Sequence, residues 1–222
     1  MTFSLLGRCA RTGQIGAAAA TSDIGVGARV QHLAAGVGAV LTQHRTDPRL
    51  GPRGVALLRS GCAAGEVVEA LVASTPHRAW RQLAVIDAAG RTAHFHGERV
   101  KPARGHAHGP GESGGCVAIG NILANEVVPA AMVAAFGRDP EVALAERLLA
   151  ALRAGEAAGG ERGPVLSAVL EVHGEHDFPL VDLRVDRAED PVAALAALYR
   201  EYAPRIGEFV LRAVDPDRAR GG

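Results

Sequence analysis

Thr2 is the residue whose position offers the clearest chemistry in this sequence. Removal of Met1 would give Thr2 a free α-amino group beside its own hydroxyl. An α-amine has a pKa of about 8, so part of it is unprotonated at neutral pH and can accept the hydroxyl proton. Threonine N-termini are a recognised way to combine nucleophile and base in one residue. Many chains begin with Met-Thr for other reasons, so Thr2 becomes informative only in a suitable fold.

Polar side chains at the ends of three predicted strands could surround Thr2. Ser22 follows one strand, Thr42 and Gln43 end another, and Asn121 lies in a third. Residues of these types are also ordinary strand caps and turn formers. If the strands lie side by side, the amide side chains could donate hydrogen bonds to a developing oxyanion. We therefore expect these four residues to contact the substrate or its oxyanion.

Two pairs of histidines are candidate metal ligands. His94 and His96 have strand spacing, and His106 and His108 lie in a Gly/Pro-rich segment. Residues i and i+2 of a strand share a face, so each pair could bind one ion. Half-exposed histidines without a ligand role are the favoured alternative, because no carboxylate or cysteine lies at a suitable spacing. We expect no bound metal and no cofactor.

The glycine-rich segment 105–120 is a second place where chemistry could occur. It lacks the Lys-Ser/Thr ending of a phosphate-binding loop, and it precedes a strand, whereas a phosphate loop joins a strand to a helix. A mobile loop that borders a site is the better interpretation. Cys116 could be a nucleophile, but a small buried thiol at the start of a strand is the commoner situation.

The composition excludes several classes of partner. The 24 basic and 24 acidic residues give a formal net charge of zero, and only 4% of residues are aromatic, which argues against nucleic acid as a ligand. The three cysteines form no CxxC pair and suggest a reducing compartment. The apolar N-terminal stretch is too short for a signal peptide, and no run approaches a membrane span. We expect a cytoplasmic protein that binds a small-molecule substrate.

Hydrophobic periodicity predicts strands in groups with pairs of helices between them. Hairpin-linked strands favour antiparallel sheets over a parallel sheet with crossover helices. Two such sheets, packed face to face with helices outside, give an α+β fold of the four-layer α-β-β-α type. We expect one domain at 1–214 and a flexible tail at 215–222, and apolar positions within 192–198 allow a homodimer. The predicted strands are 2–9, 15–22, 36–43, 80–87, 92–96, 116–123, 167–172 and 180–185, and the predicted helices are 52–58, 64–73, 126–136, 142–154 and 191–214.

Several segments of the chain have the same order and spacing as segments of a known protein family. They are MTFS at 1–4, GVGAVLTQ at 36–43, GPRGVALLRSG at 51–61, RQ at 81–82 before VID at 85–87, GNIL at 120–123, AERLLAAL at 145–152 before AGG at 158–160, and DLRVD at 182–186. In these segments the chain resembles the bacterial domain-of-unknown-function family numbered 1028, a branch of the N-terminal-nucleophile hydrolase fold. The resemblance spans nearly the whole chain. It implies an α-β-β-α sandwich and an amide-cleaving superfamily whose nucleophile is the first mature residue, which only Thr2 matches. Gln43 and Asn121 fall in matching segments, and the family implies no particular substrate.

The chain departs from the family pattern at polar positions. Ile119 and Leu166 stand where the family has glutamine, Glu161 where it has aspartate, and Arg187 and Ala188 where it has an acidic residue and histidine. The resemblance favours a hydrolase that cleaves an amide, ureide or peptide-like bond of a small metabolite, with Thr2 as nucleophile after Met1 removal. The departures keep an alternative open, a non-catalytic small-molecule-binding or accessory protein that retains the fold. A histidine metal enzyme is a third interpretation.

Overall fold

The computed structural model describes residues 1–101, 103–109 and 115–220, in which two antiparallel sheets form the centre of the molecule. The larger sheet has six strands in the order β10-β9-β2-β1-β8-β7, and the smaller has four in the order β3-β4-β5-β6. The chain therefore begins with an interior strand of the larger sheet, paired on both sides. The strands are β1 (Thr2–Arg8), β2 (Ile15–Thr21), β3 (Gln31–Ala34), β4 (Gly38–His44), β5 (Arg81–Asp87), β6 (Thr92–His96), β7 (Gly105–Gly109), β8 (Cys116–Asn121), β9 (Ser167–His173) and β10 (Pro179–Val185).

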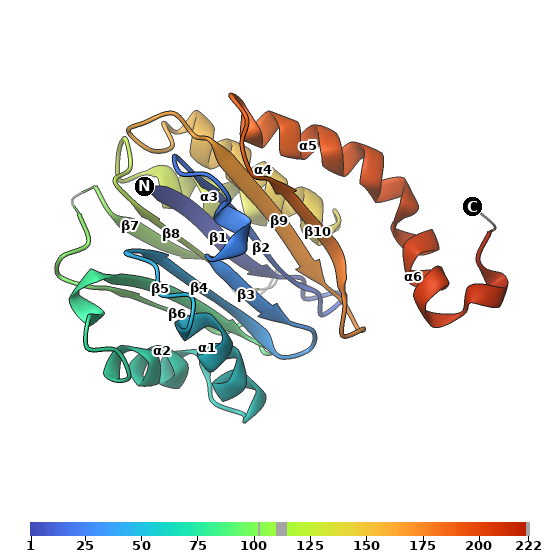
Figure 1. Ribbon diagram of the computed structural model, residues 1–222, viewed down its shortest axis with the longest axis horizontal. Coiled ribbons are helices and arrows are strands. Elements are labelled where there is room, and N and C mark those ends of the chain that lie inside the picture. The colour runs from blue at the N-terminus through green and yellow to red at the C-terminus, as the bar shows by residue number, and fades with distance from the viewer. Residues whose placement is uncertain (102, 110–114, 221–222) are drawn as a thin grey trace.

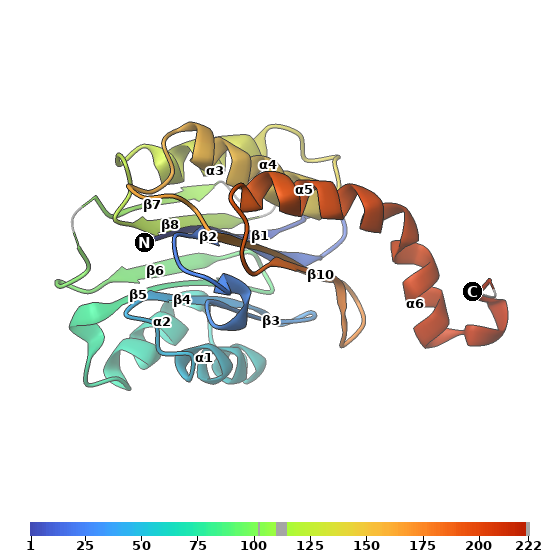
Figure 2. The same ribbon diagram turned by 45° about the horizontal axis from the view of Figure 1, so that its top comes forward.

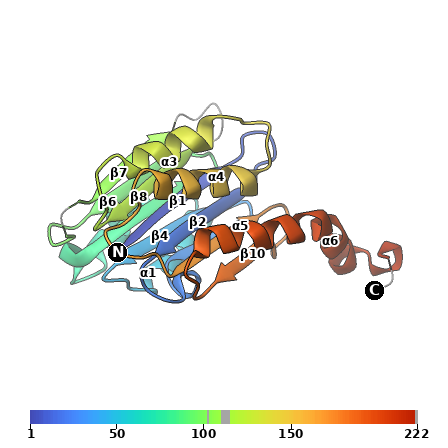
Figure 3. The same cartoon turned by 90° about the horizontal axis from the view of Figure 1, so that it is seen from above.

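Helices cover the outer face of each sheet, which gives the order helix, sheet, sheet, helix (Figures 1 and 2). The smaller sheet is covered by α1 (Leu50–Arg59) and α2 (Ala64–Ala73). The larger sheet is covered by α3 (Val128–Gly137), α4 (Leu144–Ala157) and α5 (Pro191–Tyr202), which lie over its strands when the molecule is seen from above (Figure 3). A final helix, α6 (Ile206–Val214), extends past the sandwich.

Alternation along the strands separates three apolar layers. In β1, Leu6 packs into the layer between the sheets, whereas Phe3 and Leu5 pack against the outer helices. In β4, Leu41 belongs to the layer between the sheets and Val40 to the layer beneath α1 and α2. Successive side chains of a strand point to opposite faces, so both faces of each sheet are buried. The even-numbered positions of β1 therefore face the second sheet.

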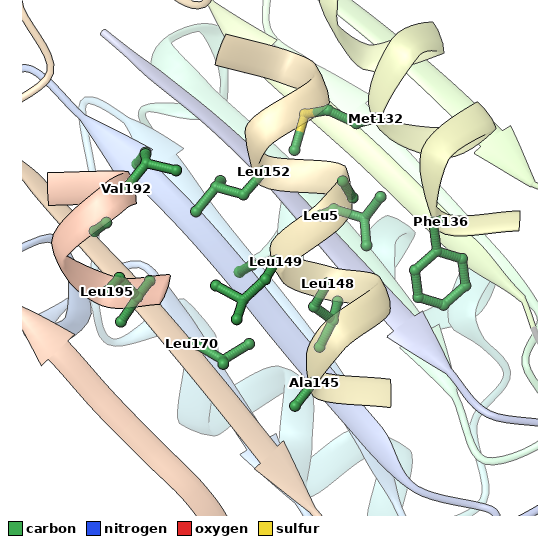
Figure 4. Close-up of a cluster of buried hydrophobic side chains, with 14 of the residues drawn as sticks. Leu5, Met132, Phe136, Ala145, Leu148, Leu149, Leu152, Leu170, Val192 and Leu195 are labelled. Atoms are coloured by element: carbon green, nitrogen blue, oxygen red, sulfur yellow. The ribbon is translucent and has the colours of Figure 1, made fainter. Parts of the chain in front are cut away.

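Small residues in β2 allow α4 to lie close to the larger sheet. A Cβ added at Gly16 would come within 2.5 Å of the Leu148 side chain, and Ala18 and Ala20 are fully buried beside it. Leu148, Leu149 and Leu152 of α4 fill the space above the strands (Figure 4). A helix packed this closely leaves little room for larger strand residues, which explains the small residues on the face of β2 that meets α4.

The predicted architecture is confirmed, with local differences. The sequence analysis missed β3, a short strand, and it predicted a loop where β7 forms. The glycines and histidines of β7 carry little β-propensity, and pairing with β8 supplies the backbone hydrogen bonds instead. The predicted helix 191–214 is wrong as a single element, because Pro204 ends α5 through a 3-10 turn at Ala203–Arg205 before α6 begins. Residues 110–114 of the glycine-rich segment lie outside the described residues. Of the predicted tail 215–222, Pro216–Arg218 forms a 3-10 turn.

None of the helices in the described residues combines the length and the apolar character needed to span a membrane.

Replacement of Leu148 by alanine tests the packing of α4 on the larger sheet. The side chain is fully buried, so Leu148→Ala should lower the free energy of unfolding by about 2–5 kcal/mol, from lost apolar burial and the cavity left behind. Leu198→Ala is the matched control, because Leu198 is 39% exposed on α5 and should change stability by about 0.5 kcal/mol or less. Urea unfolding of both variants measures the difference. Equal losses would contradict this packing.

Candidate active site

Thr2 lies at the end of the layer between the two sheets. It pairs with Thr21 of β2 on one side and Asn121 of β8 on the other. All three are buried, with Thr2 only 6% exposed. The alternation that places Leu6 between the sheets places Thr2 on the same face. The fold thus brings the predicted nucleophile and one predicted amide together.

Two hydroxyls meet at the carbonyl of the Met1–Thr2 bond. The Oγ1 of Thr2 lies 3.1 Å from the Oγ1 of Thr21 and donates to the Met1 carbonyl at 2.5 Å. The hydroxyl of Thr21 also donates to that carbonyl. Met1 itself is 37% exposed, whereas Thr2 is buried. Cleavage of this one peptide bond would leave the Thr2 amine and hydroxyl next to the Thr21 hydroxyl.

A pocket of about 420 Å³ includes Thr2, Thr21 and Met1 in its wall. Three cationic side chains also line it, Arg29, Arg45 and Lys101. Asp23, another lining residue, pairs with Arg29 at 3.2 Å. Arg45 and Lys101 take part in no ion pair within the described residues. The pocket therefore offers uncompensated positive charge to an anionic group of a ligand.

His44 is a pocket residue that the sequence analysis missed. Its backbone has a φ of 61°, an uncommon conformation for a residue with a side chain, and its ring stacks on Trp80. The Nδ1 lies 3.0 Å from the Trp80 carbonyl, which can only accept, so the proton is on Nδ1, and Nε2 accepts a long hydrogen bond of 3.5 Å from the backbone N–H of Lys101. Burial lowers the pKa of His44, and nearby cationic groups lower it further. The imidazole is therefore neutral at pH 7.

Beneath Thr2, buried amide side chains join the two sheets. Ser4 donates to the Oε1 of Gln43 at 2.6 Å, and the Nε2 of Gln43 donates to the Oε1 of Gln82 at 2.7 Å. The Nδ2 of Asn121 donates to the same Gln82 oxygen at 2.9 Å, and the Nε2 of Gln82 donates to the carbonyl of Gly120 at 2.7 Å. This chain of hydrogen bonds fixes the orientation of Asn121 beside Thr2.

The predicted contact residues fall into different places. Gln43 and Asn121 belong to the amide network and do not line the pocket, so the structure gives them a positioning role next to Thr2. Ser22 lies one residue beyond β2, beside Glu161. Thr42 lies on the opposite face of β4 from Gln43, with its hydroxyl directed to the Asp47 carbonyl at 3.4 Å. The structure therefore does not bring Thr42 to Thr2.

Glu161 contributes a buried carboxyl group close to the N-terminus. It is 6% exposed, and neither of its oxygens accepts a well-formed hydrogen bond within the described residues. Burial raises its pKa to about 7, although the N-terminal amino group and Ser22 oppose the shift. Backbone pairing with Leu123 places it beside the turn at Ile122, which lines the pocket and has a φ of 55°. Unpartnered buried groups and strained backbone are common at functional sites.

The other candidates lie away from Thr2. Burial raises the pKa of the Cys116 thiol to about 11, so it is protonated at neutral pH and is a poor nucleophile. The two histidine pairs, which the sequence treats as separate, meet in one cluster at the edges of both sheets.

Comparisons with known proteins identify relatives without an assigned activity. Residues 2–195 match a family model described as a family of unknown function, DUF1028. The crystal structure of protein SPO2555 from Silicibacter pomeroyi, attributed to the same family model, superposes with a TM-score of 0.84 at 32% sequence identity. The similarity covers 93% of this chain and 94% of the other. No curated protein matches the sequence.

Substitution of Glu161 tests the environment of its carboxyl group. In the folded state the Glu161 carboxyl group has a pKa of about 7, whereas the ordinary value is 4.5. The free energy of unfolding therefore falls as the pH rises through this interval, because the unfolded chain releases the proton first. Relative to Glu161→Gln, the wild type should lose on the order of 3 kcal/mol of stability between pH 4.5 and 7.5. Urea unfolding at several pH values measures this. A constant difference between the two proteins would disprove the buried, unpaired carboxyl.

Proposed function

Since this chain belongs to the DUF1028 family, we propose, from the geometry around Thr2, that it is an N-terminal-nucleophile hydrolase. In this proposal Thr2 becomes the first residue after Met1 is removed, and the enzyme cleaves an amide, ureide or peptide-like bond of a small cytoplasmic metabolite. The observation that carries it is the Thr2 hydroxyl, which lies in the wall of a pocket with Met1 attached on the pocket side.

The first half of the reaction acylates Thr2. The free α-amine takes the proton of the Thr2 hydroxyl, and Oγ1 attacks the carbonyl carbon of the substrate. The C–N bond then breaks, and the departing nitrogen receives the proton held by the α-ammonium group. The hydroxyl of Thr21, 3.1 Å from Oγ1, orients the nucleophile by a hydrogen bond. The product of this half is an ester of Thr2 and a free amine.

Water completes the reaction. The same α-amine accepts a proton from a water molecule, whose oxygen attacks the ester carbonyl, and the C–O bond to Thr2 breaks as Oγ1 regains its proton. The buried amide network holds Asn121 beside Thr2 on the neighbouring strand and so keeps this centre in position.

The charge of the pocket narrows the substrate class within this proposal. Arg45 and Lys101 present positive charge next to Thr2, and both lack an acidic partner within the described residues. A carboxylate on the substrate would form charge-assisted hydrogen bonds with these groups. We therefore propose an amide that also carries a carboxylate.

A binding protein without catalytic activity is the second candidate. In the chain that retains Met1, both threonine hydroxyls are bonded to the Met1 carbonyl. The hydroxyl of Thr2 is then not free to attack, while the cationic pocket can still bind an anion. The two candidates differ in whether Thr2 becomes acylated.

Labelling with a β-lactone tests the nucleophile. Ring opening by Thr2 Oγ1 adds the whole mass of the lactone as an ester, which intact-mass and peptide mass spectrometry detect. We expect wild-type protein without Met1 and the Thr2→Ser variant to be labelled, and Thr2→Ala to react at least about 10³-fold more slowly. Circular dichroism and thermal unfolding check that the variants are folded. Labelling of Thr2→Ala, or none in processed wild type, would refute the proposal.

Neutralisation of the pocket cations tests the substrate class. Arg45→Gln and Lys101→Gln should each slow acylation by a carboxylate-bearing lactone about tenfold, which corresponds to the loss of one charge-assisted hydrogen bond. A neutral lactone of similar size should be affected much less. Arg200→Gln, at an exposed position of α5, is the control and should not change either rate. Equal effects on both lactones would disprove anion recognition.

A further inference from the structure

Four histidines from the two sheets come together at one edge of the sandwich. His94 and His96 lie on β6, the edge strand of the smaller sheet, and His106 and His108 on β7, the edge strand of the larger sheet. The rings of His94 and His106 stack with centroids 3.6 Å apart, and those of His96 and His106 are 5.4 Å apart. At this edge the two sheets therefore contact each other through imidazole rings and not through apolar side chains.

We propose that His94, His96 and His106 bind one divalent transition-metal ion, of which zinc is the best example, and so link the two sheets. One ligand nitrogen from each of these residues lies within 4.8 Å of the others. Zinc–nitrogen bonds of about 2.0–2.1 Å in tetrahedral geometry need ligand atoms about 3.3 Å apart. Small rotations of these exposed and half-buried rings would bring the three nitrogens to the spacing that zinc needs. A water molecule would be the fourth ligand of the ion.

The protonation states suit metal binding. Burial lowers the pKa of His94 to about 4 and that of His96 to about 3, and the neighbouring imidazoles lower both further. Neutral imidazoles at pH 7 are the form that binds a metal ion. The guanidinium of Arg104 also lowers the pKa of His96, and it donates hydrogen bonds to the carbonyls of Gly97 and Val100.

Hydrogen bonds from Thr92 and His108 orient the ring of His94. Thr92 Oγ1 lies 2.6 Å from His108 Nδ1, and His108 Nε2 lies 2.8 Å from His94 Nδ1, which leaves His94 Nε2 for the ion. Partners of this kind orient metal-binding histidines. The Nε2 of His96 lies 3.2 Å from the Gln82 amide, and an ion bound there would replace that one hydrogen bond. Gln82 would keep its bond to the Gly120 carbonyl.

This arrangement is not visible in the sequence. The two His-x-His pairs look like separate candidates for weak sites, and no carboxylate or cysteine accompanies either. In the fold the two pairs form one cluster, because they lie on facing edge strands of different sheets.

Titration with zinc chloride tests the proposal on the full chain after removal of metals by chelation. Calorimetry at pH 7.5 should show saturable binding of one zinc ion per chain. The melting temperature should rise by about 5–10 °C when free zinc is a hundredfold above the Kd. Cobalt(II) should give the visible absorption bands of a tetrahedral site.

Two variants and a control locate the site. His94→Ala and His106→Ala should each weaken zinc binding at least tenfold and abolish the rise in melting temperature. His106 is exposed, so its loss should leave the metal-free fold intact. His176→Ala, in the turn between β9 and β10, is the control and should bind zinc as the wild type does. Absence of saturable binding, or binding unchanged in both cluster variants, would overturn the proposal.

Discussion

Pairing of β1 on both of its edges determines where the candidate active site can be. Hydrogen bonds to β2 and β8 fix the register that sets Thr2 opposite Thr21 and Asn121. A shift of one residue would turn Leu6 out of the layer between the sheets and bury Thr2 against the helices. The apolar side chains of β1 therefore hold the first strand residue in place, while Met1 lies outside that constraint with part of its surface exposed.

The layer between the sheets changes in character along its length. Its middle is apolar, as with Ile86 and Ile119, and its end near Thr2 contains the linked side chains of Gln43, Gln82 and Asn121. Buried amides are stabilising only when their hydrogen bonds are made, and here the two sheets supply each other's partners. The carboxyl group of Glu161, which lacks such a partner, lies beside Ile122 in the pocket wall.

Strong periodic signals account for what the sequence could predict. The alternating apolar runs of β1, β4 and β5 and the helix at 64–73 are clear, and they suffice for the layer order. The position of Thr2 directly after Met1 is read from the sequence, and Gln43 and Asn121 are noticed because they lie at the ends of apolar strands. His44 and Glu161 were not assigned to the site, because their roles depend on a left-handed backbone and on burial by a distant segment. Thr42 was expected at the site together with Gln43, but it lies away from Thr2, because neighbouring residues of a strand point to opposite faces.

The position of Met1 in the wall of the pocket has a practical consequence for how this protein is produced. Residues fused ahead of Thr2 would extend into the pocket and would leave no free threonine amine there. Helix α6 lies far from the N-terminus of the chain (Figure 1). An affinity tag therefore belongs at the C-terminus, because an uncleaved N-terminal tag would prevent any test of Thr2 as the proposed nucleophile.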